Sequence, residues 1–266
     1  MCLLVVAWHV DARAPLVVAA NRDERLDRPA AAAVVLQERA PRIVGGRDQE
    51  AGGTWLAVND HGVVAGLTNR PGQQGRDPSK RSRGELPLAL AAHTDAESAV
   101  EQFAQRFRPC DYNPSWLLVG DRRSLFYLDM TDGDHAQVRA LPPGIHILEN
   151  NPIDAGTAKQ RRVAGLLGTM GSLQEKDATA PDQSGLDVAR LAAVLGDHSP
   201  PDDLTDLPEG VDPAVLAACV HTDRYGTRSA AIVRVLDDAD ALPEILVADG
   251  HPCTAPFKDV GVLWRS

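Results

Sequence analysis

The stretch CLLVVAWHVDARAPLVVAANRDE, residues 2–24, decides the fold that the sequence predicts. It contains two apolar runs, residues 2–8 and 16–20, separated by the turn-forming residues DARAP. Short apolar runs on either side of a turn are typical of a β-hairpin. We therefore expect an antiparallel strand pair that starts at Cys2, with the second strand bringing the polar residues NRDE to the level of Cys2.

The rest of the chain follows a similar pattern of hairpins, then helices, then strands. Two further hairpins are expected at residues 54–58 with 63–68 and at residues 115–119 with 125–130. Helices are expected after Gly84-Glu85, after a capping box at Thr94-Asp95-Ala96-Glu97, and at residues 159–167 and 186–195. The polar stretch 171–184 predicts a surface loop, and residues 229–236, 244–249 and 260–264 predict strands. This order predicts a single α+β domain over residues 1–266, with antiparallel sheets covered by helices.

Composition limits the function. The 266 residues are 44% hydrophobic and carry a formal net charge of −10, which argues against a protein whose main task is to neutralise nucleic-acid phosphates. No run approaches the roughly 20 apolar residues of a membrane-spanning helix, so no stable membrane insertion is expected. The first residues carry no positively charged lead and no small-residue cleavage site, which predicts a cytoplasmic protein.

Cysteine and histidine spacing gives no metal-binding motif. The four cysteines are scattered without a CxxC pair, so neither a disulfide framework nor a zinc knuckle is predicted. Cys219 and His221 would share one face of a strand, but two ligands alone do not make a site. We therefore predict no metal and no cofactor. The residues considered are Cys2, Cys110, Cys219, Cys253, His61, His93, His135, His146, His198, His221 and His251.

Cys2 is the first candidate for catalysis. If Met1 is removed, the thiol has its own α-amino group as the nearest base, and the unperturbed pKa of that amine, near 8, lets it take the thiol proton at neutral pH. A retained Met1 would block this chemistry. The alternative is that Cys2 is a small apolar residue that opens a buried strand.

Three further positions have two interpretations each. Asp23 could orient the amine and Asn21 could donate to an oxyanion, or both could belong to a solvated turn. Arg228, just before the apolar run 230–235, is either a solvated strand start or a cation in a cleft. Within about 4 to 6 Å of Cys2, such a cation would favour the thiolate.

The paired glycines at 45–46 and 52–53 fit tight turns better than a phosphate loop.

Seven motifs, taken in order, resemble the NRDE family, also called the transport and Golgi organisation protein 2 family. That resemblance implies the four-layer αββα fold of N-terminal-nucleophile hydrolases, with greatest similarity to the penicillin acylases and bile-salt hydrolases that start with cysteine. The motifs are Met1-Cys2, Ala19-Ala20-Asn21-Arg22-Asp23-Glu24, Arg28-Pro29, Gly52-Gly53-Thr54-Trp55, Leu67-Thr68-Asn69, Arg83-Gly84-Glu85-Leu86 and Tyr225-Gly226-Thr227-Arg228.

The resemblance also implies roles for individual residues. Cys2 would be the nucleophile and Asp23 would orient its amine, while Asn69 and Asn150 would line the oxyanion hole. Arg228 would be the cation that favours the thiolate. Asn21, Arg22 and Thr68 would contact the ligand.

One departure from the pattern concerns an arginine. Those hydrolases carry it where this chain has Ala20, and here Arg22 stands two positions further on. A shift of two residues keeps the strand face but moves the guanidinium roughly 7 Å along the strand.

Two functions follow from the resemblance, and a purely structural role with a partner is a third alternative. The first is hydrolysis of a linear amide through an acyl-thioester on Cys2, which needs a small-molecule amide or acyl ligand. The second is trafficking of haem, lipid or acyl-CoA on the same fold without catalysis. The enzyme needs a free α-amine and a reactive thiol, whereas the carrier needs neither.

Overall fold

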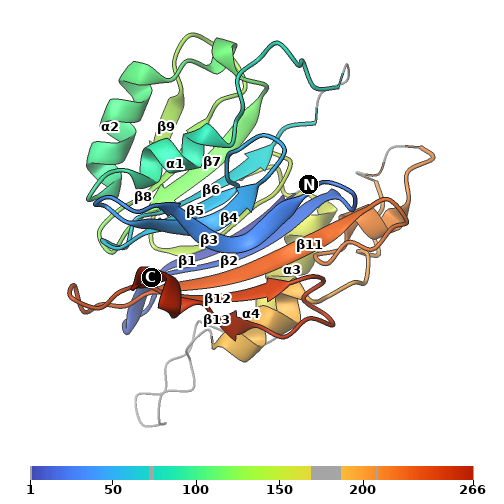
Figure 1. The fold of residues 1–266 in the computed structure, drawn as a ribbon. Coiled ribbons are helices and arrows are strands. Elements are labelled where there is room, and N and C mark those ends of the chain that lie inside the picture. Colours follow the sequence, from blue (N-terminus) through green and yellow to red (C-terminus); the bar gives the residue numbers. More distant parts are fainter. Residues whose placement is uncertain (1, 72–74, 169–186, 206, 208, 266) are drawn as a thin grey trace.

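The computed structural model describes residues 2–71, 75–168, 187–205, 207 and 209–265. Two antiparallel sheets stack face to face, with helices on both outer sides (Figure 1). The order of strands in the first sheet is β10-β1-β2-β11-β12-β13, and in the second it is β3-β4-β5-β6-β7-β8-β9. This confirms the predicted αββα architecture.

The first sheet carries both ends of the chain. Its strands are β1 (Cys2–Asp11), β2 (Ala14–Arg25), β10 (Gly144–Leu148), β11 (Tyr225–Val235), β12 (Glu244–Asp249) and β13 (Lys258–Asp259). The second sheet is built from the middle of the chain. Its strands are β3 (Ala30–Gln37), β4 (Ile43–Asp48), β5 (Leu56–Asn59), β6 (Val64–Asn69), β7 (Ser115–Gly120), β8 (Leu125–Asp129) and β9 (Gln137–Ala140).

The helices form the two outer layers. Helices α1 (Glu85–Ala91) and α2 (Ala96–Arg106) cover the second sheet, and α3 (Ala158–Gly168) and α4 (Val188–Leu195) cover the first (Figure 1). Single 3₁₀ turns occur at η1 (Pro109–Asp111), η2 (Pro213–Leu216) and η3 (Gly261–Trp264). Among the described residues, no helix combines the length and the apolar character needed to cross a membrane.

Strand β1 shows why its sequence is apolar without interruption. Leu4, Val6 and Trp8 point into the core between the two sheets. The alternate residues of the strand, among them Leu3 and Val5, pack against the helices α3 and α4. Because neighbouring side chains of a strand point to opposite faces, a strand that is buried on both faces needs an apolar residue at every position.

The structure corrects three details of the sequence analysis. Residues 261–264, expected to be a strand, form η3, because the carboxylate of Asp259 accepts a hydrogen bond from the backbone of Gly261 (2.6 Å) and turns the chain. The N-cap of α2 is Asp95 and not Thr94, and its side chain accepts from the Ser98 backbone at 2.8 Å. Strands β3, β4, β9, β10 and β13 had not been expected. The predicted loop 171–184 lies outside the described residues.

A close backbone contact joins the second sheet to helix α1, next to the cleft described below. Gly53 and Gly84 face each other, and the backbone of Thr54 donates to the carbonyl of Gly84 at 2.9 Å. A Cβ added to Gly53 would lie 2.5 Å from the carbonyl carbon of Gly84, and one added to Gly84 would lie 2.9 Å from the Cα of Gly53. Both glycines are therefore needed for this approach.

We expect Gly53→Ala to lower the free energy of unfolding by about 1 to 3 kcal/mol, because the overpacked backbone must move apart. Urea unfolding measures this change. The control is Gly165→Ala in α3, where an added Cβ has no atom within 4 Å and better helix propensity should raise stability by up to about 1 kcal/mol. Equal stability of Gly53→Ala and the wild type would show that the contact is not tight.

Candidate active site

The register between β1 and β2 determines which side chains meet at the start of the chain. Cys2 lies opposite Arg22, and Leu3 lies opposite Asn21. By strand alternation, Cys2 and Arg22 share the face that carries Leu4 between the two sheets, whereas Asn21 points to the helix side. Cys2 is buried, with 8% of its surface exposed. The thiol therefore lies at the end of the inter-sheet core, next to a guanidinium.

A cleft of about 720 Å³, open to solvent, begins at Cys2. Its walls are mostly polar, and five arginines and three acidic residues contribute to them. The lining residues used below are Cys2, Arg22, Asp23, Arg28, Asp48, Trp55, Asn69, Arg76 and Arg83. Charged walls are unlike the apolar pocket that a purely apolar acyl chain would need.

The carboxylate of Asp23 is held from behind the sheet. Its side chain is fully buried, and the hydroxyl of Thr227 on β11 donates to Oδ1 at 2.5 Å. The ammonium of Lys159 on α3, itself only 1% exposed, lies 3.7 Å from Oδ2. Sequence reasoning missed Lys159, which looked like an ordinary polar residue at the start of a helix. A buried carboxylate needs such a counter-charge.

Asn150, just past β10, connects Cys2 to Asn69. Its side-chain Oδ1 accepts a hydrogen bond from the backbone N–H of Cys2 at 3.1 Å. Its Nδ2 donates to the backbone carbonyl of Asn69, at the end of β6. Asn150 thus presents an acceptor to the nitrogen of Cys2, and Asn69 is the residue of the pair that lines the cleft.

Burial, together with the charge of Asp23, raises the pKa of the Cys2 thiol above its ordinary value, against the opposing effects of the N-terminal charge, the Arg22 charge and a backbone hydrogen bond from Asp23. Removal from water disfavours the thiolate more than this one guanidinium favours it. The thiol is therefore protonated at neutral pH. It needs an adjacent base before it can act as a nucleophile.

The guanidinium of Arg22 is fixed by its neighbours. It donates to the carboxylate of Asp48 at 3.1 Å and stacks 4.4 Å from the centre of the Trp55 ring. Arg28 donates to both oxygens of the same carboxylate, at 2.7 and 3.2 Å. Burial acts to raise the pKa of Asp48, but the hydrogen bonds and charges of Arg28 and Arg22 hold it below its ordinary value. Asp48 is another member of the site that the sequence analysis did not single out.

Arg83 brings a further cation to the cleft. Its guanidinium donates to the carbonyl of Pro114 at 3.0 Å, and it makes no ion pair with any described residue. Burial, together with the nearby charge of Arg76, lowers the pKa of Arg83 to about 10. Arg83 is half-buried, and a cation in such a position that makes no ion pair favours an anionic ligand.

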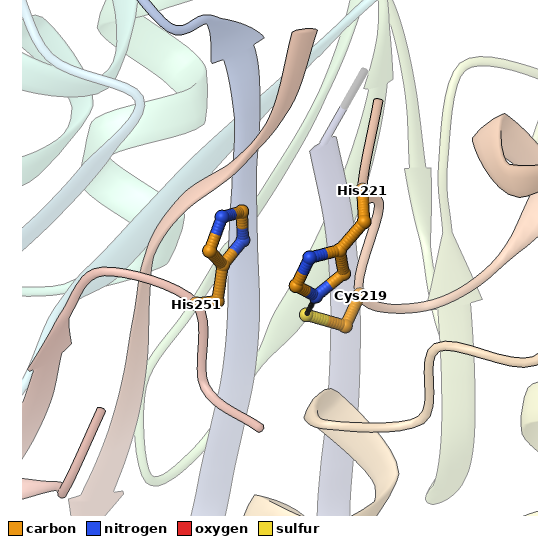
Figure 2. A group of neighbouring side chains, drawn as sticks. All are labelled: Cys219, His221 and His251. Carbon is orange, nitrogen blue, oxygen red and sulfur yellow. Dashed lines mark hydrogen bonds between the residues drawn. The ribbon is translucent and has the colours of Figure 1, made fainter. Parts of the chain in front are cut away.

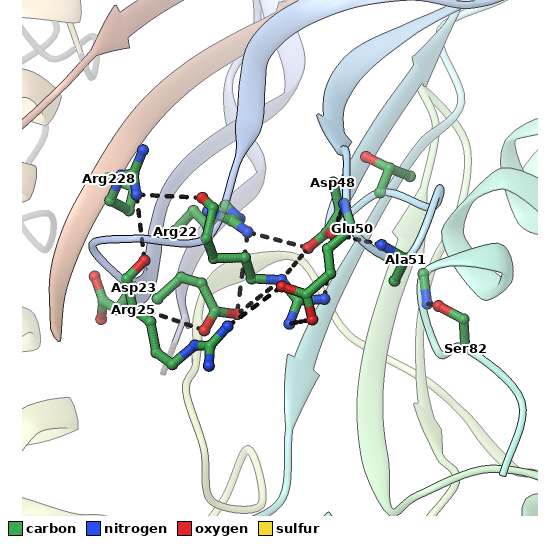
Figure 3. A network of polar contacts seen from close by, with 12 residues as sticks. Arg22, Asp23, Arg25, Asp48, Glu50, Ala51, Ser82 and Arg228 are labelled. Atoms are coloured by element: carbon green, nitrogen blue, oxygen red, sulfur yellow. Dashed lines mark hydrogen bonds and ion pairs between the residues drawn. The ribbon is translucent and has the colours of Figure 1, made fainter. Parts of the chain in front are cut away.

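Three residues expected in the site lie elsewhere. Arg228 is not among the residues that line the cleft. Its Nη1 donates to the backbone carbonyls of Arg25, Leu26 and Arg28 (Figure 3). The register between β2 and β11 shifts between Thr227 and Ser229, and this bulge at Arg228 redirects its side chain.

The other two are Asn21 and Thr68. Asn21 donates both Nδ2 hydrogens away from the cleft, to the carbonyls of Leu195 (2.9 Å) and Ala218 (2.8 Å). Thr68 is fully buried between two cleft-lining residues of β6 and does not line the cleft itself. Strand alternation accounts for both placements, because each residue is one position away from a cleft-facing neighbour.

The layers and the strand order define the fold class of the protein. Two stacked antiparallel sheets with helices outside them are the fold of N-terminal-nucleophile hydrolases. The chain belongs to the Transport and Golgi organisation 2 family, whose sequence profile matches residues 1–241. This confirms the resemblance noted in the sequence.

Two curated relatives support the family, and a solved structure supports the fold. The chain is 28% identical over 240 residues to the Transport and Golgi organization 2 homolog of Mus musculus, covering 83% of this chain and 82% of the mouse protein. It is 29% identical over 248 residues to the Bos taurus homolog, covering 85% and 83%. Among solved structures, the N-acylethanolamine-hydrolyzing acid amidase ortholog of Caenorhabditis elegans superposes with a TM-score of 0.54 at 12% identity, covering 91% of this chain and 98% of that one. This last similarity shows the fold.

We expect Asp48→Asn to destabilise the protein by about 1 to 3 kcal/mol at pH 7, because two guanidinium groups lose their charged acceptor. The folded-state pKa of Asp48 lies below its ordinary value of 3.8, so its contribution is fully present above that pH and is lost as the pH falls through the folded-state pKa. Unfolding free energies measured from pH 7 downward should therefore begin to converge for wild type and variant below about pH 4, as Asp48 becomes protonated. The exposed Glu101→Gln on α2 serves as control, and a constant difference at every pH would contradict the assignment.

Lys159→Met should lower the free energy of unfolding by about 3 kcal/mol or more, because Asp23 keeps its buried charge without the ammonium. Adding Asp23→Asn to this variant removes that charge and should cost less than the sum of the two single changes. A double-mutant cycle by urea unfolding measures the coupling. Lys258→Met on the exposed strand β13 is the control. Additive effects of the two changes would show that Lys159 and Asp23 do not interact.

Proposed function

We propose that this protein is an N-terminal cysteine amidohydrolase that cleaves a linear amide carrying an anionic group. The observation that carries the proposal is the pairing of Cys2 with Arg22 at the head of an arginine-rich cleft. The amidase of similar fold from C. elegans is named for hydrolysing N-acylethanolamines, which are also linear amides.

The reaction requires removal of Met1, so that the nitrogen of Cys2 becomes a free amine. This amine takes the proton of the Cys2 thiol, whose raised pKa leaves it protonated at neutral pH. The thiolate attacks the amide carbonyl carbon and forms a tetrahedral oxyanion. The ammonium then returns the proton to the departing amine, and an acyl-thioester remains on Cys2. Water, deprotonated by the same amine, hydrolyses that thioester and restores the thiol.

The neighbours of Cys2 suit separate tasks in this scheme. Asn150 presents Oδ1 to the nitrogen of Cys2, so we assign it to positioning the amine. An oxyanion needs a donor, and the side chain of Asn69 in the cleft is our candidate. Asp23, paired with Lys159 at 3.7 Å, is assigned to orienting the start of the chain, and its charge adds to the raised pKa of the Cys2 thiol. Arg22 takes the place of Arg228 as the cation that favours the thiolate.

The cleft favours a substrate with a carboxylate or a similar anion. Arg83 is half-buried and makes no ion pair with a described residue, and Arg76 lies near it. The Nη1 of Arg22 is also buried without a hydrogen-bond partner in the described chain. An anionic group would satisfy these donors through charge-assisted hydrogen bonds, whereas a neutral amide would leave them unpaired.

The test uses full-length protein with Met1 removed, as verified by intact mass, and a panel of N-acyl amides with and without a carboxylate on the amine side. We expect turnover with an acyl adduct on Cys2, and loss of turnover and adduct in Cys2→Ala. Arg83→Met should raise KM for the carboxylate substrates about 10- to 100-fold and change kcat/KM for neutral amides less than twofold.

Arg234→Met is the matched control, because Arg234 is paired with Glu244 on the far part of the first sheet and should leave the kinetics unchanged. Melting curves confirm that each variant is folded. A protein that has lost Met1 and yet forms no adduct and releases no product would overturn the hydrolase assignment. Saturable binding of haem or acyl-CoA without turnover would support the carrier function instead.

A further inference from the structure

A cluster of sulfur and nitrogen ligands lies behind the first sheet, away from the cleft. Cys219 and His221 come from the segment between η2 and β11, and His251 and Cys253 follow β12. The ligand atoms of Cys219, His221 and His251 all lie within 4.8 Å of one another, and Figure 2 shows the three side chains gathered at one point. The sequence alone showed only two ligands, Cys219 and His221, because nothing in it predicts that His251 and Cys253 lie next to them.

A fourth residue, Cys253, lies beside two members of this group, Cys219 and His221. Its Sγ lies 3.2 Å from His221 Nε2 and 3.9 Å from Cys219 Sγ, and the Cys219 Sγ lies 3.3 Å from the same nitrogen. Zinc in a tetrahedral site binds sulfur at about 2.3 Å and nitrogen at about 2.0 to 2.1 Å, which places two sulfurs about 3.8 Å apart and a sulfur and a nitrogen about 3.5 Å apart. These three spacings, which join Cys219, His221 and Cys253, are within a few tenths of an ångström of the expected values.

His251 gives an independent sign of an unmet ligand. Its Nδ1 is shielded from solvent and has no hydrogen-bond partner in the described part of the chain. Its ring stacks on that of His221, with centroids 4.0 Å apart. A buried ring nitrogen without a partner is costly, and a metal ion would satisfy it.

We propose that Cys219, His221, His251 and Cys253 form a structural site for one zinc ion. The two ligand pairs, Cys-x-His and His-x-Cys, come from segments 30 residues apart that only the pairing of β11 with β12 brings together. A Cys₂His₂ set without an open position for water is typical of structural zinc. The site therefore joins these two segments and does not itself carry out chemistry.

The site is linked to the candidate active site through Thr227. The backbone N–H of Val220, between the two ligands of the first pair, donates to the hydroxyl of Thr227 at 2.9 Å. That hydroxyl donates in turn to Asp23 at 2.5 Å. Bound zinc would therefore stiffen the segment that supports the Asp23 carboxylate. The proposal does not depend on the proposed hydrolysis, because the metal site would exist in a non-catalytic carrier too.

The experiment measures zinc directly in the full-length protein, purified with a reductant. We expect about one zinc per chain by elemental analysis, retained after gel filtration and removed by a chelator. Cobalt titrated into the metal-free protein should give the absorption bands of a tetrahedral thiolate site. Chelation should lower the melting temperature of the wild type.

Cys253→Ser is the informative variant, since Cys253 is exposed and its loss should not impair folding. We expect it to weaken zinc binding at least 100-fold and to make melting insensitive to the chelator. Cys110→Ser, an exposed cysteine remote from the cluster, should bind zinc as the wild type does.

Two results would overturn the proposal. One is a reduced protein with four titratable thiols that binds neither zinc nor cobalt. The other is equal zinc affinity in Cys253→Ser and wild type. A Cys219–Cys253 disulfide is detected by mass as the loss of two hydrogens. If it is present, the protein is reduced and the metal binding is measured again, and failure of the reduced protein to bind metal overturns the proposal.

Discussion

The antiparallel register of β1 with β2 is the constraint on which the rest of the site depends. Both strands are buried on both faces, so a slip of one residue would turn every side chain to the opposite face. Such a slip would put Asn21 into the cleft and send Arg22 among the apolar residues under α3 and α4. The core residues Leu4 and Leu3, on opposite faces of β1, therefore hold Cys2 and Arg22 in place as much as any polar contact does.

The charges around this strand pair are arranged in two separate groups. On the cleft side, Asp48 holds Arg22 and Arg28, while Arg83 is left without an ion pair among the described residues. On the helix side, Lys159 neutralises Asp23. The protein is acidic overall, with a net charge of −10, yet the cleft gathers arginines. This local reversal of charge is what a site for an anionic substrate requires.

Some parts of the site could be predicted from the sequence and others could not. The apolar run of β1 and its turn predicted that Cys2 opens a buried strand, and alternation predicts which neighbours share its face. Lys159 gave no signal, because a lysine at the start of a helix is ordinarily solvated. Arg228 was misplaced because a β-bulge leaves no mark in a sequence, and its single extra residue changes where the side chain points.

By itself the sequence determined the hairpins, the helices, the family and the cysteine that opens the first strand, because these depend on periodicity and on short motifs within one segment. Only the tertiary structure decided which distant residues meet. Asp23 contacts Lys159, which is 136 residues away in the sequence, and Cys219 lies beside Cys253, which is 34 residues away. Strand pairing and helix packing bring these residues together. The physical reason is that local patterns specify which face of an element is buried, whereas side-chain contacts depend on how whole elements are stacked.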